Sequence, residues 1–241
     1  MDNVVKICLG LFIVILAAFT GSVVYMEYSE MAYRNTLTGT YSYACTITTD
    51  SSLYNVTLFI PVPVDTMGNS PIVSEFSNKM MTGVPSGWDM TLFDTGKSTL
   101  VKITTPEIIA PDGTSAQHPY TIVITTETAS RTPIDTRNPV ERSALFRPVQ
   151  ALSEKACPQA GSSRCFTYTT SLYADYSTSA DTIVTITSSV TGKNTWKIFE
   201  PRSNEYHADI STSMKGDHKG WAVPAGGLSS GIGSYDIPAG A

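Results

Sequence analysis

The sequence is poor in charged residues and in the motifs from which common active sites are built. Only 15% of its 241 residues are Asp, Glu, Lys or Arg, against roughly 25% in soluble domains. The net charge of -5 and the lack of a basic cluster argue against nucleic-acid binding, because a binder must neutralise phosphates with Lys and Arg. No HExxH or P-loop motif occurs, no GxSxG sequence forms a strand-to-helix elbow, and no GxGxxG follows a strand. We therefore expect a protein that is not an enzyme, holds no cofactor or metal and does not bind nucleic acid.

One long stretch of the chain carries no charge at all. Residues 7–26 read ICLGLFIVILAAFTGSVVYM and would span about 30 Å as a helix, the thickness of a bilayer's hydrocarbon core. Its Leu, Ile, Val and Phe residues together favour insertion by roughly 3 to 6 kcal/mol. We predict a transmembrane helix over 7–26, between a cytoplasmic N-terminus (1–6) and a stalk (27–37).

The charges that flank this stretch predict its orientation. Lys6 precedes it, and Glu27 and Glu30 follow it, so the positive-inside bias places the N-terminus in the cytoplasm and the rest of the chain outside. Tyrosines on the outer side fit an interfacial aromatic belt: they are Tyr25, Tyr28 and Tyr33.

Two features leave alternatives for this stretch. A cleaved signal peptide usually has an apolar core of 7–15 residues that ends at a small-x-small site, and the best candidate cut, after Ser22, matches this poorly. Ala17 and Gly21 form a small-xxx-small pair, which permits close contact between helices in lipid. We favour a retained anchor, with self-association of the helix as a further hypothesis.

The period of the hydrophobic pattern changes to two after the stalk. The residues expected on buried strand faces include Tyr41, Tyr43, Cys45, Ile47, Val56, Leu58, Ile60, Met90, Val101, Ile103, Ile122, Ile124, Phe166, Tyr168, Val184, Ile186, Tyr206 and Ile210. About nine short strands follow, so the predicted fold class is all-β, an antiparallel β-sandwich over 38–241 preceded by one transmembrane helix. The pattern leaves one domain or two smaller β modules open. Pro61 and Pro63 predict that their strand ends at a sheet edge.

Three segments interrupt the strand pattern. Residues 128–164 are predicted to be a long insertion loop with a short helix from Pro139 to Phe146. Gly192-Lys193-Asn194 is interpreted as a turn. The Gly-rich tail, 216–241, carries enough apolar residues to form a final strand or hairpin.

The cysteines and one sequon predict covalent features. Cys157 and Cys165 bracket a turn-rich loop and should form a disulfide worth about 2–3 kcal/mol in an oxidising compartment. Cys45 is interpreted as a buried thiol, with an intermolecular bond as the alternative. Cys8 is a small apolar residue of the helix or an acylation site. Asn55-Val56-Thr57 is a sequon for N-glycosylation at Asn55.

The candidate contact residues are four arginines near the predicted insertion: Arg131, Arg137, Arg142 and Arg147. They would contact an acidic partner or lipid headgroups, or they belong to a solvated loop balanced by nearby carboxylates. A metal site at His207, Asp209, Asp217 and His218, or a Ca²⁺ site at Asp175 and Asp181, is a weaker alternative than plain surface residues.

In general style, an N-terminal anchor before a Thr/Ser/Tyr-rich β domain, the chain resembles uncharacterised archaeal cell-surface proteins. The resemblance implies a location and no chemistry. The outline is also similar to archaeal pilins and archaellins, although Met1–Lys6 lacks their Lys/Arg-Gly type processing site and no glutamate lies early in the helix.

We therefore predict a membrane-anchored extracytoplasmic structural or interaction protein of the cell envelope, which acts by protein–protein contact. Its expected partners are membrane lipid through residues 7–26 and another protein or a second copy. The alternatives are a pilin-like filament subunit, an accessory subunit of a membrane complex, and a surface hydrolase with an unrecognised site.

Overall fold

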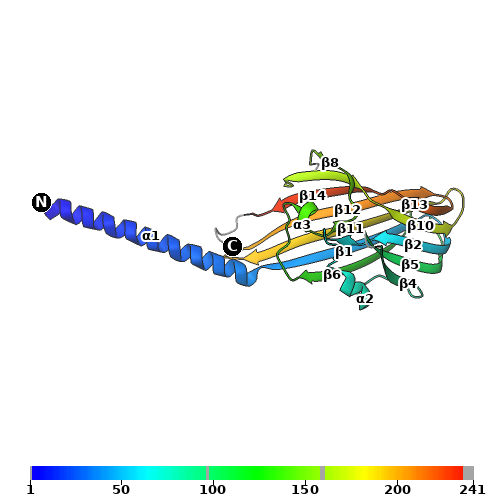
Figure 1. Ribbon diagram of the computed structural model, residues 1–241, viewed down its shortest axis with the longest axis horizontal. Helices are drawn as coiled ribbons and strands as arrows, with labels where there is room; N and C mark the ends of the chain where they lie inside the picture. The colour runs from blue at the N-terminus through cyan, green and yellow to red at the C-terminus, as the bar shows by residue number, and fades with distance from the viewer. Residues whose placement is uncertain (1, 96–97, 158–160, 236–241) are drawn as a thin grey trace. The chain divides into compact units, whose positions relative to one another are not determined.

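The computed structural model describes residues 2–95, 98–157 and 161–235 and contains one long helix followed by antiparallel sheets (Figure 1). This confirms the predicted fold class. The chain divides into two compact units. The first contains α1 (Asp2–Thr36) and residues 195–203, and the second contains residues 38–194 and 204–233.

The second unit is built on two main sheets (Figure 1). The seven-stranded sheet has the spatial order β6 (Tyr120–Ser130), β1 (Thr38–Thr49), β11 (Ile183–Lys197), β12 (Pro201–Lys215), β14 (Ala225–Gly233), β9 (Arg164–Thr169), β8 (Gln150–Lys155). The five-stranded sheet has the order β13 (His218–Ala222), β10 (Leu172–Ser177), β2 (Leu53–Pro61), β5 (Thr99–Ile108), β4 (Asp89–Asp94). The small elements are β3 (Pro63–Val64), which pairs with β7 (Leu145–Phe146), and the helices α2 (Val73–Ser77) and α3 (Pro139–Arg142).

The core lies between the inner faces of the two main sheets. Alternate residues of β1 and β2 are buried, from Tyr41 to Ile47 and from Val56 to Ile60, as the period of two predicts. Residues from both sheets form one hydrophobic cluster, which is the packing of a β-sandwich.

Pro61 at the end of β2 and Pro63 at the start of β3 lie beyond the point where one side of the β2 ladder has ended. β2 is a central strand, but its pairing with β10 stops at Phe59, whereas β5 pairs as far as Pro61. The Val62 N–H donates to the Thr99 carbonyl at 2.9 Å, so the positions of Pro61 and Pro63 alternate to the opposite side. The missing N–H of Pro61 therefore costs no ladder bond with β5 or β10.

Two of the three interruptions differ from the sequence interpretation. Gly192-Lys193-Asn194 is not a turn, because β11 runs through it and the Tyr206 ring occupies the place of a side chain at Gly192. The predicted insertion contains strands β7 and β8, and its helix ends at Arg142 because Leu145 and Phe146 pair with β3. The tail forms the predicted final strand, β14, and not a hairpin, because β13 and β14 lie in different sheets.

Some of the predicted boundaries fall outside the description of the structure. Residue 1, residues 158–160 of the insertion and residues 236–241 of the tail lie outside the described residues. The predicted stalk is helical, since α1 continues to Thr36.

Candidate functional site

The helix α1 exposes an apolar surface on every side. Residues 3–36 form the one helix in the described part of the chain that is long and apolar enough to cross a membrane, with a mean hydropathy of 2.6 in its most apolar window and none of that window buried. The polar side chains in it are satisfied locally: the Thr20 hydroxyl donates to the Leu16 carbonyl at 2.9 Å, and the Ser22 hydroxyl to the Phe19 carbonyl at 2.7 Å. Lipid could therefore surround the helix without leaving these hydroxyls unpaired.

The end of α1 packs on the tip of the β11–β12 hairpin within the first unit. Phe199 of the tip lies 6.0 Å from the Tyr25 ring and 5.6 Å from the Tyr28 ring, between centroids. Trp196 meets Tyr33 edge to face at 5.6 Å, which buries Tyr33. The predicted aromatic belt is thus divided, because Tyr25 and Tyr28 stay exposed with Phe199 whereas Tyr33 is a packing residue.

Hydrogen bonds fix the same junction. The Thr36 hydroxyl donates to the Lys197 carbonyl at 3.0 Å and accepts the Lys197 N–H at 2.9 Å. The same hydroxyl lies 2.6 Å from the Ala32 carbonyl, so one side chain at the C-terminal end of the helix contacts main-chain groups of both the helix and the hairpin. The junction between helix and hairpin is therefore both apolar and hydrogen-bonded.

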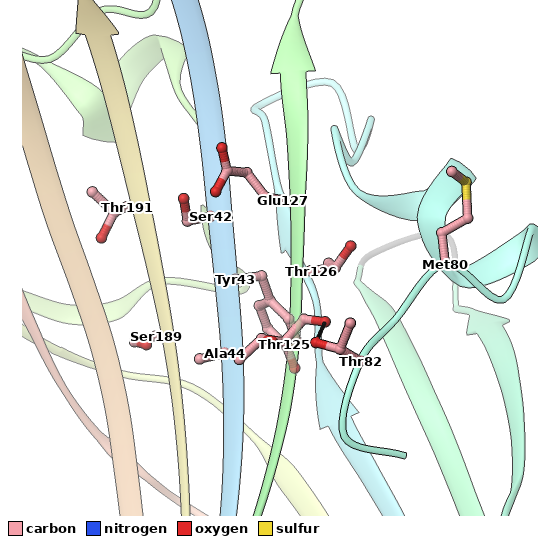
Figure 2. A pocket seen from close by; sticks show the side chains of 10 residues that line it. All are labelled: Ser42, Tyr43, Ala44, Met80, Thr82, Thr125, Thr126, Glu127, Ser189 and Thr191. Atoms are coloured by element: carbon pink, nitrogen blue, oxygen red, sulfur yellow. Dashed lines mark hydrogen bonds between the residues drawn. The ribbon is translucent and has the colours of Figure 1, made fainter.

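A shallow cavity of about 360 Å³ lies on the outer face of β6, β1 and β11 (Figure 2). Figure 2 shows Thr82 beside Thr125 at one end of it, with their hydroxyls 2.7 Å apart. Thr82 and Thr125 also exchange two main-chain hydrogen bonds, which protect part of the exposed edge of β6. Its lining residues are Ser42, Tyr43, Ala44, Met80, Thr82, Thr125, Thr126, Glu127, Ser189 and Thr191.

This lining offers hydrogen bonding and little chemistry. Glu127 is its single charged residue, and the lining contains no histidine, cysteine or lysine. A carboxylate among hydroxyls can bind a polar ligand, but it lacks the paired base and nucleophile of covalent catalysis. A second cavity, of about 170 Å³, is lined by Phe76, Lys79, Met81, Val84, Trp88, Asp89 and Met90.

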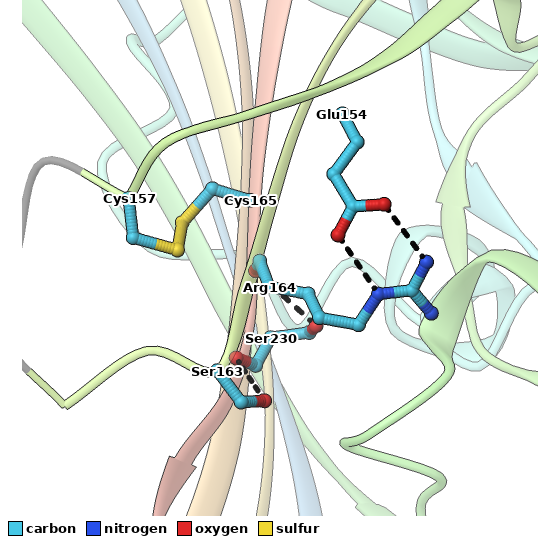
Figure 3. Close-up of polar contacts among 6 residues, drawn as sticks. All are labelled: Glu154, Cys157, Ser163, Arg164, Cys165 and Ser230. Carbon is cyan, nitrogen blue, oxygen red and sulfur yellow. Dashed lines mark hydrogen bonds and ion pairs between the residues drawn. A yellow bond between two sulfur atoms is a disulfide. The ribbon is translucent and has the colours of Figure 1, made fainter.

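The predicted disulfide is present and fastens an edge of the seven-stranded sheet. Cys157 is bonded to Cys165, with a Cα–Cα distance of 5.1 Å (Figure 3). Next to it, both terminal oxygens of Glu154 accept from Arg164 at 3.2 Å, and this hydrogen bonding lowers the pKa of the Glu154 carboxyl. The edge strand β8 is thereby held to β9 covalently and by a bidentate ion pair.

The remaining cysteines differ in exposure. Cys45 is only 2% exposed, as predicted, and burial raises its thiol pKa to about 11. Cys8 is exposed on α1. The sequon residue Asn55 is exposed in β2, with a left-handed backbone (φ 54°) that asparagine tolerates.

The four arginines do not share one environment. Arg131, Arg137 and Arg142 are exposed. Arg147 is half-buried, and its guanidinium donates to the carbonyls of Val64 at 3.1 Å and Val140 at 2.8 Å. Burial lowers the pKa of Arg147. Its hydrogen bonds join β3 to the segment at α3, and a contact role for the other three stays a prediction.

The candidate metal ligands do not gather at one point: His207 and Asp209 lie 4.0 Å apart (Nε2–Oδ1), and the other candidate carboxylates bond to separate partners. His207 bonds to the Thr191 hydroxyl at 3.1 Å, and Asp217 accepts the Thr178 N–H at 2.6 Å. Asp175 pairs with Lys219 at 3.4 Å, and Asp181 with Lys215 at 3.0 Å. Among the described residues no group of three or more His, Cys, Asp or Glu could hold a metal ion.

The outer face of the five-stranded sheet carries a row of exposed rings that sequence reasoning missed. The rings pack edge to face with 5.6 Å between successive centroids. We call this the aromatic row: Phe93, Phe59, Tyr173 and Trp221. The available signal was an outward-facing ring in each of four separate strands. Bringing the four rings together requires the order of the strands in the sheet, which no local sequence pattern contains.

Comparison of the chain with protein-family models, with curated proteins and with solved structures finds no match.

Proposed function

We propose that the protein is a single-pass, membrane-anchored domain outside the cytoplasm that acts by contact with proteins or other material of the cell envelope. The observation that carries this proposal is the uniformly exposed apolar surface of α1, directly followed by a folded β domain. An apolar helix without a protein cover is stable in lipid and would aggregate in water.

Two further features support the extracytoplasmic side. The Cys157–Cys165 disulfide is typical of an oxidising compartment. Lys6 before the apolar stretch, with Glu27 and Glu30 after it, agrees with a cytoplasmic N-terminus.

Membrane retention is tested with charges in the helix. Two central arginines (Ile13→Arg with Leu16→Arg) cost roughly 5 to 7 kcal/mol, which matches or exceeds the predicted insertion energy. We expect the full-length variant to leave the membrane fraction after alkaline extraction, whereas the apolar control (Ile13→Leu with Leu16→Ile) stays. A wild-type chain found in the soluble fraction without detergent would refute the proposal.

Orientation is tested by labelling whole cells with a membrane-impermeant maleimide. Asp112→Cys introduces a thiol at an exposed position of the β domain, and Asn3→Cys introduces one at the start of α1. We expect Asp112→Cys to be labelled in intact cells and Asn3→Cys only after permeabilisation. The reverse pattern would place the β domain in the cytoplasm.

Self-association through α1 is a second candidate, which also includes the filament alternative. Gly10 and Gly21 have open space where a side chain would start, and Ala17 lies on the same helical face. Such a face lets a second helix approach closely in lipid. We expect Ala17→Leu to reduce cross-linking between copies in membranes, whereas Ala18→Leu, one position around the helix, leaves it unchanged. Equal cross-linking of both variants would exclude this face.

A further inference from the structure

We infer that the outer face of the five-stranded sheet binds an oligosaccharide attached to Asn55, and that the aromatic row is its docking surface. The inference rests on the proposed extracytoplasmic location, because a sequon is used only in chains that reach the glycosylation machinery.

The aromatic row is too exposed to serve the core. Trp221 is 61% exposed and Phe93 51%, while Phe59 and Tyr173 between them are half-buried. Tyr173 is directly opposite Phe59 on one side and Trp221 on the other. A continuous exposed apolar surface of this kind marks a binding site.

Asn55 lies on the same face as Phe59, because exposed and buried residues alternate from Asn55 onward, next to a β-bulge. Tyr54 and Asn55 are both exposed between the buried residues Leu53 and Val56. Between the pairs Tyr54–Ser177 and Thr57–Asp175, two residues of β2 oppose one residue of β10, which is a β-bulge. Beyond it the alternation resumes, and Thr57 and Phe59 point outward while Leu58 is buried.

A polar row separates Asn55 from the rings. Thr57 is opposite Asp175, and Asp175 is opposite Lys219. The Tyr173 hydroxyl donates to Asp175 at 3.4 Å, and Lys219 pairs with the same carboxylate oxygen at 3.4 Å. A chain that leaves Asn55 therefore meets carboxylate, ammonium and hydroxyl groups first, and rings next.

This order fits a carbohydrate. Sugar hydroxyls bond to Asp, Lys and Thr side chains, and the C–H faces of sugar rings stack on aromatic rings. Phe59 lies four positions beyond Asn55 along the strand, which is about 13 Å, a distance that a few sugar units cover. A protein partner would have to bind beside a bulky substituent at Asn55, so we assign the face to the attached oligosaccharide.

The test uses the full-length protein from a host that glycosylates its outer surface. Thr57→Ser keeps the sequon and Thr57→Ala removes it, so the two variants differ by one hydroxyl. Peptide mass spectrometry reports the glycan on Asn55, and hydroxyl-radical footprinting reports exposure of Trp221 and Tyr173. We expect both rings to be oxidised severalfold more slowly in wild type and Thr57→Ser than in Thr57→Ala and Asn55→Gln, while the exposed Met67 is unchanged.

A second comparison tests the rings themselves. In the glycosylated protein, Trp221→Ala should weaken the protection of Tyr173, whereas Val223→Ala, which also truncates an exposed residue, should not. The inference is overturned if Asn55 carries no glycan. It is also overturned if the rings are oxidised equally with and without the glycan. If the rings are protected equally in all variants, a second copy of the chain on this face would be indicated instead. If Asp112→Cys is labelled from outside in the same protein, any of these results overturns the inference alone and leaves the proposed location standing.

Discussion

The side chain of Asn194 ties a loop of the second unit to β11, and its removal should strongly destabilise the protein. The Asn194 carbonyl oxygen accepts the Ile134 N–H at 2.9 Å, and its amide donates to the Ile134 carbonyl at 2.8 Å. The same amide nitrogen donates to Asn204 at 2.9 Å, which also accepts from the Thr136 hydroxyl. Asn194 is only 6% exposed, so water cannot replace these partners.

The magnitude follows from the groups left behind. Asn194→Ala leaves the N–H and the carbonyl of Ile134 buried without this partner, each at a cost of about 1–3 kcal/mol, and we expect a loss of about 3 kcal/mol in the free energy of unfolding. For a domain of this size the melting temperature should fall by about 6–12 °C. Asn194→Asp keeps the acceptor and loses both donated bonds, so its loss should also be large.

The assay is thermal unfolding of the full-length protein in mild detergent, with hydrogen exchange at Ile134 as a local probe. Lys193→Ala is the matched control, because Lys193 is the exposed neighbour whose ion pair with Glu205 (3.4 Å) contributes little. A turn at Gly192-Lys193-Asn194 would make both variants mild. If Asn194→Ala and Lys193→Ala melt together, the buried network does not hold the loop.

Three further predictions concern the cysteines and one carboxylate. Replacing Cys157 and Cys165 by serine should lower the free energy of unfolding by about 2.5 kcal/mol, from the entropy of closing so short a loop; a reductant should shift the melting of wild type and not of the variant. Cys45 should resist alkylation at pH 8 until the protein is denatured, because its thiol is buried with a pKa of about 11; rapid labelling of the native protein, with Cys8 replaced by serine, would contradict this. Burial raises the pKa of Asp209. The Asp209 side chain therefore adds to the free energy of unfolding below the ordinary pKa of aspartate, where it is protonated. This contribution is lost as the pH rises through the raised pKa. Asp209→Asn should therefore be slightly more stable than wild type at pH 7 and equal to it at low pH. Urea titrations at both pH values measure this difference. No difference at pH 7 would mean that the carboxylate, which is 45% exposed, stays well solvated.

Features set by neighbours in sequence were predictable. The change of period from helical to two after the stalk separated α1 from the strands, and the short spacing of Cys157 and Cys165 predicted their bond. The buried faces of β1, β2 and β11 followed from alternation, since a strand in a sandwich has one wet and one dry face.

The interpretation of Gly192-Lys193-Asn194 failed because residue type alone carries no information on a partner strand. Glycine and asparagine favour turns when only local conformation is considered. Here a ring from β12 covers Gly192, and Asn194 finds buried main-chain partners 60 residues earlier in the chain. Tertiary contacts thus outweighed local preference at both positions.

The aromatic row shows the same limit at the level of function. Phe59, Tyr173 and Trp221 are far apart in sequence. The local sequence around each ring indicates only a solvent-facing residue of a strand. They become one surface only because β2, β10 and β13 are neighbours with matching registers. Asn55 has the same outward parity as Thr57 and Phe59, so alternation alone places it on that face. In a β-sandwich the inner face can be predicted from period alone, whereas an outer binding face depends on strand order, so a search for such sites must begin from the pairing of strands.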